Sequence, residues 1–295
     1  MSLIVFYTDA QVVVHFHHAE LAFSESNYKL TIEEASLCLL EDAEHTDALL
    51  LRGKAYHELK YYREALNDFT KALDLDPSLA DAYASRGYIF FITGDYRLAR
   101  LNYIWAIDED KVNPLYYFNL GCIYSKELKW KDAVNEYTLA IHFKPCYYDA
   151  FVNRADAEGI LKNFTAALND YDSALRIQPH NPELYILRGM NLISLKRNAE
   201  AIEMFNRSLK YKPQNGNAYY SRGRALFDLG QFTYAKANFD SAIMYIPTLG
   251  IAYFNRGVAL LELGKTNTKD ACKDFKIAAN LGFGGAWDYL KKYCE

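Results

Sequence analysis

The chain has 295 residues, a formal net charge of −4 and a hydrophobic content of 51%. This content is too high for a disordered chain, and the weak negative charge provides no basic face for nucleic acid. No apolar run approaches the roughly 18 residues that span a bilayer, and five cysteines without C-x-x-C spacing argue against a zinc site and a disulfide framework.

Residues 1–11 form an N-terminal segment with a short, apolar and β-prone stretch from Leu3 to Tyr7. The stretch is too short and uncharged for a signal peptide, and Thr8 or Asp9 is available to cap the first helix. Two roles stay open: the segment covers the first helix pair, or it occupies the groove of a neighbouring molecule. We expect a monomer, with an oligomer formed through this segment as the alternative. We also expect a cytoplasmic protein; the alternative is that the first three residues remain from cloning and replace an export leader.

From residue 46 onward, a small residue recurs every 34 residues without a slip. Such a fixed period indicates a repeat architecture. Placing the small residue at position 8 defines seven repeats, 46–79, 80–113, 114–147, 148–181, 182–215, 216–249 and 250–283. The position-8 residues are Gly53, Gly87, Gly121, Ala155, Gly189, Gly223 and Gly257.

Other positions follow the same register. Position 20 is Ala in the first six repeats, position 24 is Phe or Tyr, and position 27 is Ala or Ser. Position 4 is aromatic in six repeats, and the recurrent aromatic positions together account for much of the excess of aromatic residues in a chain with 25 tyrosines and 17 phenylalanines. All seven prolines fall at joints between repeats, where a helix ends or begins. They are Pro77, Pro145, Pro179, Pro213 and Pro247 at position 32, and Pro114 and Pro182 at position 1.

The spacing within one repeat predicts two antiparallel helices of about a dozen residues. Positions 4, 7, 8 and 11 share one helical face, as do positions 20, 24, 27 and 28. A turn signal such as Gly94-Asp95 lies between them. The small residues at positions 8, 20 and 27 are where the helices should approach most closely.

These positions resemble the consensus of the tetratricopeptide repeat (TPR) family. The resemblance covers 46–283, and 12–45 is interpreted as a degenerate repeat that caps the array. Residues 284–295 are expected to form a C-terminal capping helix, with Trp287 and Leu290 closing the apolar end. The fold that the resemblance implies is all-α: a right-handed superhelical solenoid of about eight helix pairs.

The resemblance also implies a function, because TPR arrays usually bind a peptide or partner protein in a concave groove. We therefore expect an adaptor or scaffold. The alternative is a regulatory or carrier module that encloses a small molecule, glycan or lipid chain. The first helix of each pair faces inward in this family, and the candidate groove residues follow from that placement. They are Leu50, Lys54, Tyr88, Phe91, Phe118, Asn119, Cys122, Val152, Asn153, Asp156, Ile186, Met190, Tyr220, Arg224, Phe227, Phe254 and Asn255.

Acidic residues outnumber basic ones by nine to three at the predicted groove positions, so an apolar partner with some basic character fits best. The competing interpretation is that many of these side chains are half-buried between adjacent first helices. Asn119, Asn153 and Asn255 occupy position 6, where other family members bind a ligand backbone. No repeat triplet carries the Lys, Arg and Asn set with which the family's chaperone adaptors hold a C-terminal carboxylate.

Arg recurs at position 7 and Asp or Glu at position 23, and we interpret this pairing as structural. His15, His17 and His18 cluster, but their spacing matches no metal site. Cys272 and Cys294 could lie near each other, although nothing in the spacing requires a bond between them. No strand–loop–helix nucleotide motif or nucleophile motif occurs. We therefore expect no enzyme, cofactor or metal, no nucleic-acid partner and no integral membrane segment.

Overall fold

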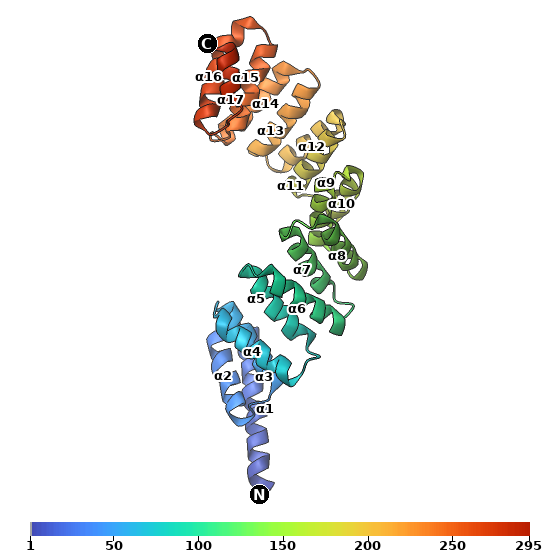
Figure 1. The fold of residues 1–295 in the computed structure, drawn as a ribbon, viewed down its shortest axis with the longest axis vertical. Helices are drawn as coiled ribbons and strands as arrows, with labels where there is room; N and C mark the ends of the chain where they lie inside the picture. Colours follow the sequence, from blue (N-terminus) through green and yellow to red (C-terminus); the bar gives the residue numbers. More distant parts are fainter. Residues whose placement is uncertain (1) are drawn as a thin grey trace. The chain divides into compact units, whose positions relative to one another are not determined.

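A computed structural model describes residues 2–295, with side chains from residue 11 onward, and this part of the chain forms seventeen α-helices and one short 3₁₀ helix (Figure 1). Successive helices pack as antiparallel pairs, as expected for eight TPR-like pairs followed by a capping helix. The chain divides into two compact units, Met1–Ala150 and Phe151–Glu295.

Unit 1 contains four helix pairs. They are α1 (Ser2–Ser24) and α2 (Tyr28–Glu41), α3 (Thr46–Glu58) and α4 (Tyr62–Leu75), α5 (Ala80–Ile92) and α6 (Tyr96–Glu109), and α7 (Pro114–Lys126) and α8 (Trp130–Phe143). The first helix of each repeat from α3 onward occupies positions 1–13, and the second begins at position 17.

Unit 2 takes most of α9 and all helices that follow. They are α9 (Tyr148–Ile160), α10 (Phe164–Ile177), α11 (Pro182–Ser194), α12 (Asn198–Tyr211), α13 (Gly216–Asp228), α14 (Phe232–Tyr245), α15 (Gly250–Glu262), the 3₁₀ helix η1 (Lys265–Asn267), α16 (Thr268–Asn280) and α17 (Ala286–Tyr293). The two residues inserted after Gly264 fall in η1, so α16 resumes the repeat pattern.

The N-terminal segment differs from the prediction. Thr8 or Asp9 was expected to cap the first helix, yet α1 already runs from Ser2 and reaches 23 residues. Short β-prone stretches join a helix when the residues that follow propagate it, because extending a helix costs less than starting one. The side chains of residues 2–10 lie outside the described part, and so do both roles suggested for this segment.

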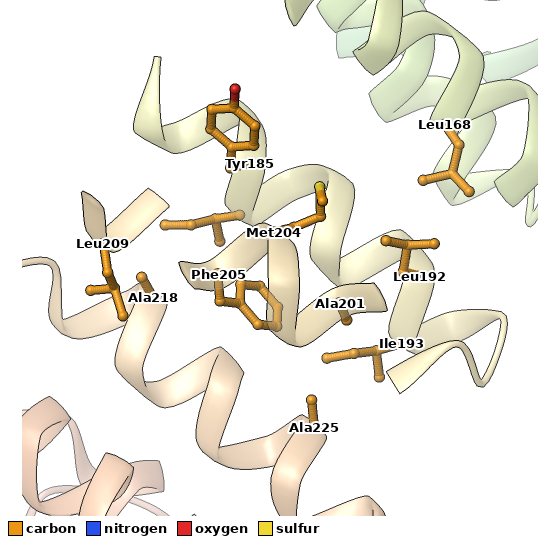
Figure 2. Close-up of a cluster of buried hydrophobic side chains, with 11 residues drawn as sticks. Leu168, Tyr185, Leu192, Ile193, Ala201, Met204, Phe205, Leu209, Ala218 and Ala225 are labelled. Atoms are coloured by element: carbon orange, nitrogen blue, oxygen red, sulfur yellow. The ribbon is translucent and has the colours of Figure 1, made fainter. Parts of the chain in front are cut away.

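Glycine at position 8 lets the paired helices approach closely. A Cβ added to Gly189 would lie 2.6 Å from Cε1 of Phe205, and one added to Gly121 would lie 2.6 Å from Cε1 of Tyr137. Figure 2 shows Phe205 inside an apolar cluster of unit 2, with Ala201 from its own helix and Leu192 from α11. Phe205 and Leu192 are both fully buried. The recurrent small residue at position 8 and the recurrent aromatic residue at position 24 thus contact each other.

Each first helix from α3 onward is followed by a residue in the left-handed backbone conformation at position 15. Glycine fills that position at Gly94, Gly230 and Gly264, as the turn signals predicted. Non-glycine residues adopt it in the other repeats, at Lys60, Leu128, Lys162 and Lys196. At the first of these turns, the N–H of Tyr61 donates to the carbonyl of Tyr56, which closes the helix end.

The prolines behave as predicted. Pro114 and Pro182 are the first residues of α7 and α11. The other five follow the C-terminal cap of a second helix. No proline lies deeper inside a helix within the described residues.

The pairing of Arg at position 7 with position 23 is confirmed as a structural contact. Arg52 donates from Nε and Nη2 to Asp68, both at 2.8 Å, and Arg256 makes the same two-bond contact with Asp274. Asp68 and Asp274 are buried. Nη1 of Arg256 also reaches Asp240 of the preceding repeat, at 2.7 Å. One guanidinium therefore ties its first helix to two successive second helices.

The third repeat breaks this series. Leu120 occupies position 7, so the position-23 carboxylate of Glu136 has no arginine beside it. Desolvation, followed by the nearby charge of Asp132, raises the pKa of Glu136 to about 7.

The C-terminal helix α17 lies close to its predicted place, but one of its two predicted contacts is wrong. Leu290 is buried at 8% exposure, whereas Trp287 is 59% exposed and covers little apolar surface. Tyr289 fills that role, with its ring 4.8 Å from Phe254 and 5.2 Å from Phe275. A helix of eight residues presents one narrow buried stripe, and Trp287 lies outside it.

Candidate functional site

Unit 1 contains a cavity of about 390 Å³ on the inward side of its first helices. Lys54 and His57 come from α3, Tyr88 from α5, and Leu115 and Asn119 from α7. The walls therefore come mainly from three successive first helices, which the 34-residue period brings into register. Phe23 of α1, together with Phe69 and Tyr103 on second helices, completes the lining.

The cavity has an aromatic and largely apolar lining. Tyr88 is 41% exposed, and its ring meets the His57 ring edge-on at 5.4 Å. Asn119 donates from Nδ2 to the hydroxyl of the buried Tyr103, at 3.0 Å. This bond uses one of the two amide hydrogens of Asn119 and fixes the orientation of its side chain.

Charged groups lie at the edge of the same cavity. The Asp81 carboxylate accepts from the Tyr116 hydroxyl at 2.8 Å and from Lys54 Nζ at 3.4 Å. Glu58 is exposed beside them. Burial, with the Asp81 hydrogen bond next, raises the pKa of Tyr116, so this hydroxyl stays a donor at neutral pH. Two acids face one lysine, and that lysine already contacts Asp81.

Unit 2 has two smaller cavities along its first helices, of about 300 and 220 Å³. Asp156 and Met190 line the larger one, and Phe227 and Phe254 line the smaller one. Arg224 borders both. Among the eight arginines of unit 2, all of whose side chains the structure describes, Arg224 alone has no hydrogen-bond or ion-pair partner.

The larger cavity of unit 2 also contains two engaged polar groups. The Tyr171 hydroxyl donates to Asp156 Oδ1, and desolvation raises the pKa of Asp156. Asn191 donates to the carbonyl of Leu187 at 3.0 Å, while its buried Oδ1 has no partner among the described residues. Asp156 is therefore committed to a contact within the fold, which weakens its case as a ligand-binding charge.

The structure brings nine of the seventeen predicted groove residues to these cavities. Lys54, Tyr88 and Asn119 line the cavity of unit 1. The cavities of unit 2 are lined by Asp156, Met190, Arg224, Phe227, Phe254 and Asn255.

The other eight predicted residues are mainly packing residues. Leu50 and Ile186 are only 9% exposed, so they offer a ligand little surface. The Phe118 ring lies 5.0 Å from that of Tyr147. The remaining five are half-buried: Phe91, Cys122, Val152, Asn153 and Tyr220. For these side chains the interpretation as packing between first helices fits better than the groove interpretation.

Several lining residues were not among the predicted ones. One of them is His57, which occupies position 12 on the inward face of its helix. Phe23 and Tyr116 also line the cavity of unit 1. The spacing of the inward positions could have identified His57. It could not have identified Tyr116, because position 3 is not one of the inward positions.

The histidine cluster has a structural partner: His15 Nδ1 lies 2.7 Å from Glu34 Oε2. Among the residues whose side chains the structure describes, no group of three or more His, Cys, Asp or Glu could hold a metal ion. No described helix is both long and apolar enough to cross a membrane.

Comparison with known proteins agrees with this architecture. Family models described as "TPR repeat" and "Tetratricopeptide repeat" match 53–94, 160–226 and 216–248. The chain is a tetratricopeptide repeat protein. TPR repeats are typically protein-binding modules, and the family is generally non-catalytic.

Two curated relatives match part of the chain. Human tetratricopeptide repeat protein 13 is 29% identical over 131 residues, which is 44% of this chain and 15% of that protein. DnaJ protein P58IPK homolog B of Oryza sativa subsp. japonica is 28% identical over 170 residues, or 50% of this chain and 35% of that protein. The matched parts therefore amount to about a third or less of these relatives.

Solved structures show the same fold at low sequence identity. The C-terminal part of a TPR repeat-containing protein from Cytophaga hutchinsonii aligns with a TM-score of 0.70 at 18% identity, over 81% of this chain and 98% of that one. A TPR protein from Parabacteroides merdae gives 0.60 at 18% identity, over 85% and 99%. YrrB, described as a TPR protein with an unusual peptide-binding site, gives 0.52 at 20% identity, over 64% and 97%.

Proposed function

We propose that this chain binds an extended segment of a partner protein on the inward faces of its first helices. The cavity of unit 1 is the anchoring site. The observation that carries the proposal is that three successive repeats together line one open, largely apolar cavity of about 390 Å³, large enough for one or two apolar side chains. We assign no catalytic step to this cavity.

The charges at the edge of the cavity favour a segment with basic residues beside its apolar anchor. Asp81 and Glu58 supply two carboxylates, and Lys54 offsets only part of their charge. Opposite charge at the edge of an interface mainly speeds association and selects among partners. Binding should therefore weaken as ionic strength rises, because exposed charges are screened.

A selection of random peptides displayed on phage, followed by affinity measurement, tests this proposal. The selected peptides are measured against wild type, Tyr88→Asp and the control Tyr234→Asp. Tyr88 is 41% exposed in the cavity, while Tyr234 is 67% exposed on a second helix of unit 2. We expect apolar peptides with neighbouring Lys or Arg, and a loss of at least about tenfold in affinity for Tyr88→Asp alone.

Circular dichroism first establishes that both variants keep the helical content of wild type. Selected peptides that bind wild type and both variants equally well would place the binding surface elsewhere. That result would overturn the assignment of the cavity.

A further inference from the structure

The C-terminal helix α17 is attached to the rest of unit 2 by a short glycine-rich joint. Residues 281–285, between α16 and α17, include three glycines. Gly282 has φ +87°, and a Cβ at Gly282 or Gly284 would meet nothing within 4 Å. In the closed position the joint is held by the N–H of Gly282, which donates to the carbonyl of Ala279 at 3.0 Å, and by the ring of Phe283, which lies 4.8 Å from that of Phe254. Once these contacts are released, the glycines give the backbone the freedom to turn.

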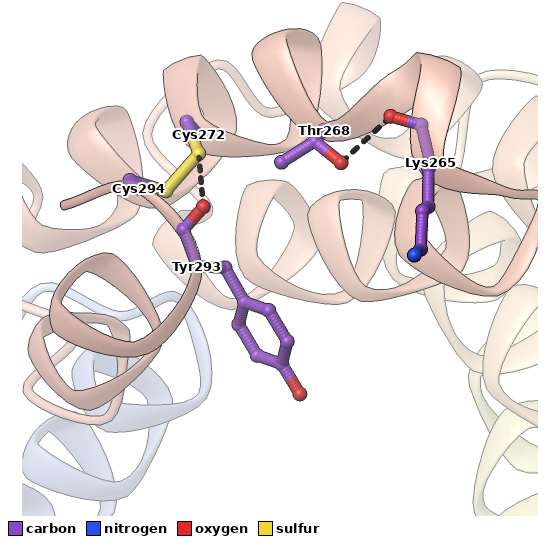
Figure 3. Close-up of a disulfide and its surroundings, with 5 residues drawn as sticks. All are labelled: Lys265, Thr268, Cys272, Tyr293 and Cys294. Carbon is purple, nitrogen blue, oxygen red and sulfur yellow. Dashed lines mark hydrogen bonds between the residues drawn. A yellow bond between two sulfur atoms is a disulfide. The ribbon is translucent and has the colours of Figure 1, made fainter.

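A disulfide fastens the other end of the same helix. Cys272 lies on α16, and Cys294 directly follows the last residue of α17 (Figure 3). The two Cα atoms are 5.8 Å apart, and 22 positions of sequence separate the two residues. Both sulfur-bearing residues are half-buried rather than enclosed, so a reductant can reach them.

Between the joint and the disulfide, α17 covers the apolar end of unit 2. Ala286 and Leu290 are buried, and the Tyr289 ring packs against Phe254 and Phe275. Tyr289 also forms one side of the 220 Å³ cavity that Phe227 and Phe254 line. Moving α17 away would therefore uncover aromatic surface and open this cavity.

We propose that the Cys272–Cys294 disulfide is a redox latch that holds α17 closed over this aromatic surface. An eight-residue helix is marginal by itself, and α17 has no side-chain hydrogen bond at its N-cap. Its position depends on the apolar contacts and on the covalent link. The latch acts within unit 2 and is independent of partner binding in unit 1.

The opening step is thiol–disulfide exchange with an external dithiol. One thiolate of the dithiol attacks a sulfur of the pair, which forms a mixed disulfide and releases the other cysteine as a thiolate. The second thiol of the dithiol then displaces the remaining cysteine. The dithiol leaves as a cyclic or protein disulfide, having supplied two electrons, and Cys272 and Cys294 each take up a proton.

The other cysteines do not compete for this exchange within unit 2. Cys38, Cys122 and Cys146 all belong to unit 1 and form no disulfide with another described residue. Cys38 is also buried, and that burial, with the charge of Asp42 next, raises its thiol pKa to about 11, which makes it unreactive at neutral pH.

Hydrogen exchange of the full chain, oxidised and then reduced with dithiothreitol, tests the latch. Releasing a closed loop of this size should speed exchange of the α17 amides by roughly a hundredfold, while α11 to α14 keep their rates. Fluorescence of the apolar dye anilinonaphthalene sulfonate should rise on reduction. Cys294→Ser should resemble the reduced protein with or without dithiothreitol, and Cys146→Ser should resemble wild type.

Several results would overturn the latch. Five reactive thiols in the denatured, unreduced chain would show that the bond does not form; three are expected. Equal exchange of α17 in oxidised and reduced wild type would show that the apolar contacts alone hold the helix. Faster exchange spread evenly over unit 2 would show that the disulfide stabilises the whole unit rather than holding α17 in place. The wild-type comparison remains decisive even if Cys294→Ser fails to fold.

Discussion

Gly189→Ala should destabilise the protein, whereas the equivalent change Gly87→Ala should not. At Gly189 the new Cβ would lie 2.6 Å from Cε1 and 2.8 Å from Cζ of the fully buried Phe205. At Gly87 the nearest atoms are Cβ of Asn102 at 3.1 Å and Cε2 of Tyr103 at 3.2 Å. Both changes gain about 1 kcal/mol of helix propensity, but only the first must displace a ring that has no free space.

Overpacking a core costs about 1–3 kcal/mol. Subtracting the helix-propensity gain leaves an expected loss of up to about 2 kcal/mol for Gly189→Ala, and a change between zero and a gain of about 1 kcal/mol for Gly87→Ala. Urea unfolding followed by circular dichroism measures both, with the transition of each unit fitted separately because repeat arrays need not unfold in one step. If Gly189→Ala were as stable as Gly87→Ala, the close approach would not be what requires glycine at position 8.

Three further changes test other contacts. Glu136→Gln should stabilise the protein at pH 8 by about 1–2 kcal/mol, a figure discounted because water screens this half-buried group, and should change little at pH 4. The folded-state pKa of about 7 lies above the ordinary 4.5, so stability is lost as pH rises between these values. Equal effects in urea unfolding at both pH values would contradict this. Arg256→Met should lower the free energy of unfolding by about 3 kcal/mol, because the buried carboxylate of Asp274 loses its partner. An unchanged melting temperature would show that the pair is dispensable. Leu128→Gly should leave the stability of the protein unchanged or raise it by up to about 1 kcal/mol, since Leu128 is 70% exposed with φ +60°. A clear fall in the melting temperature would mean that the Leu128 side chain makes stabilising contacts.

The repeat pattern predicted the helices well because each recurrent residue meets a local requirement of helix packing or of a helix end. The series at position 8 and the prolines at positions 1 and 32 place helix faces and ends without any knowledge of distant contacts. The left-handed residues Lys60 and Leu128 escaped prediction, since neither side chain is suited to that conformation. Their backbone is set by the helix end that they close.

The candidate site was only partly predictable. Position along an inward face identified Tyr88 and Asn119, but could not separate them from Leu50, which lies on the same face and is buried. That difference depends on how far the neighbouring helix reaches over each side chain. The sequence left the disulfide open for a related reason: Cys272 and Cys294 meet only because α17 folds back onto α16.

The missing arginine at Leu120 has a consequence for how unit 1 comes apart. Elsewhere a guanidinium links a first helix to the second helix of the repeat before it, as Arg86 does with Thr70. Between α6 and α7 that position-7 link is absent, and two other polar contacts join the helices: Asn119 Nδ2 donates to the Tyr103 hydroxyl at 3.0 Å, and Arg100 Nη1 donates to Glu127 Oε2, at the end of α7, at 3.2 Å. In a linear array, cooperativity is transmitted only through neighbouring interfaces. Under denaturant or a pulling force, we expect the loss of these two contacts to separate α1 to α6 from α7 and α8, because no guanidinium at position 7 holds the junction once they break.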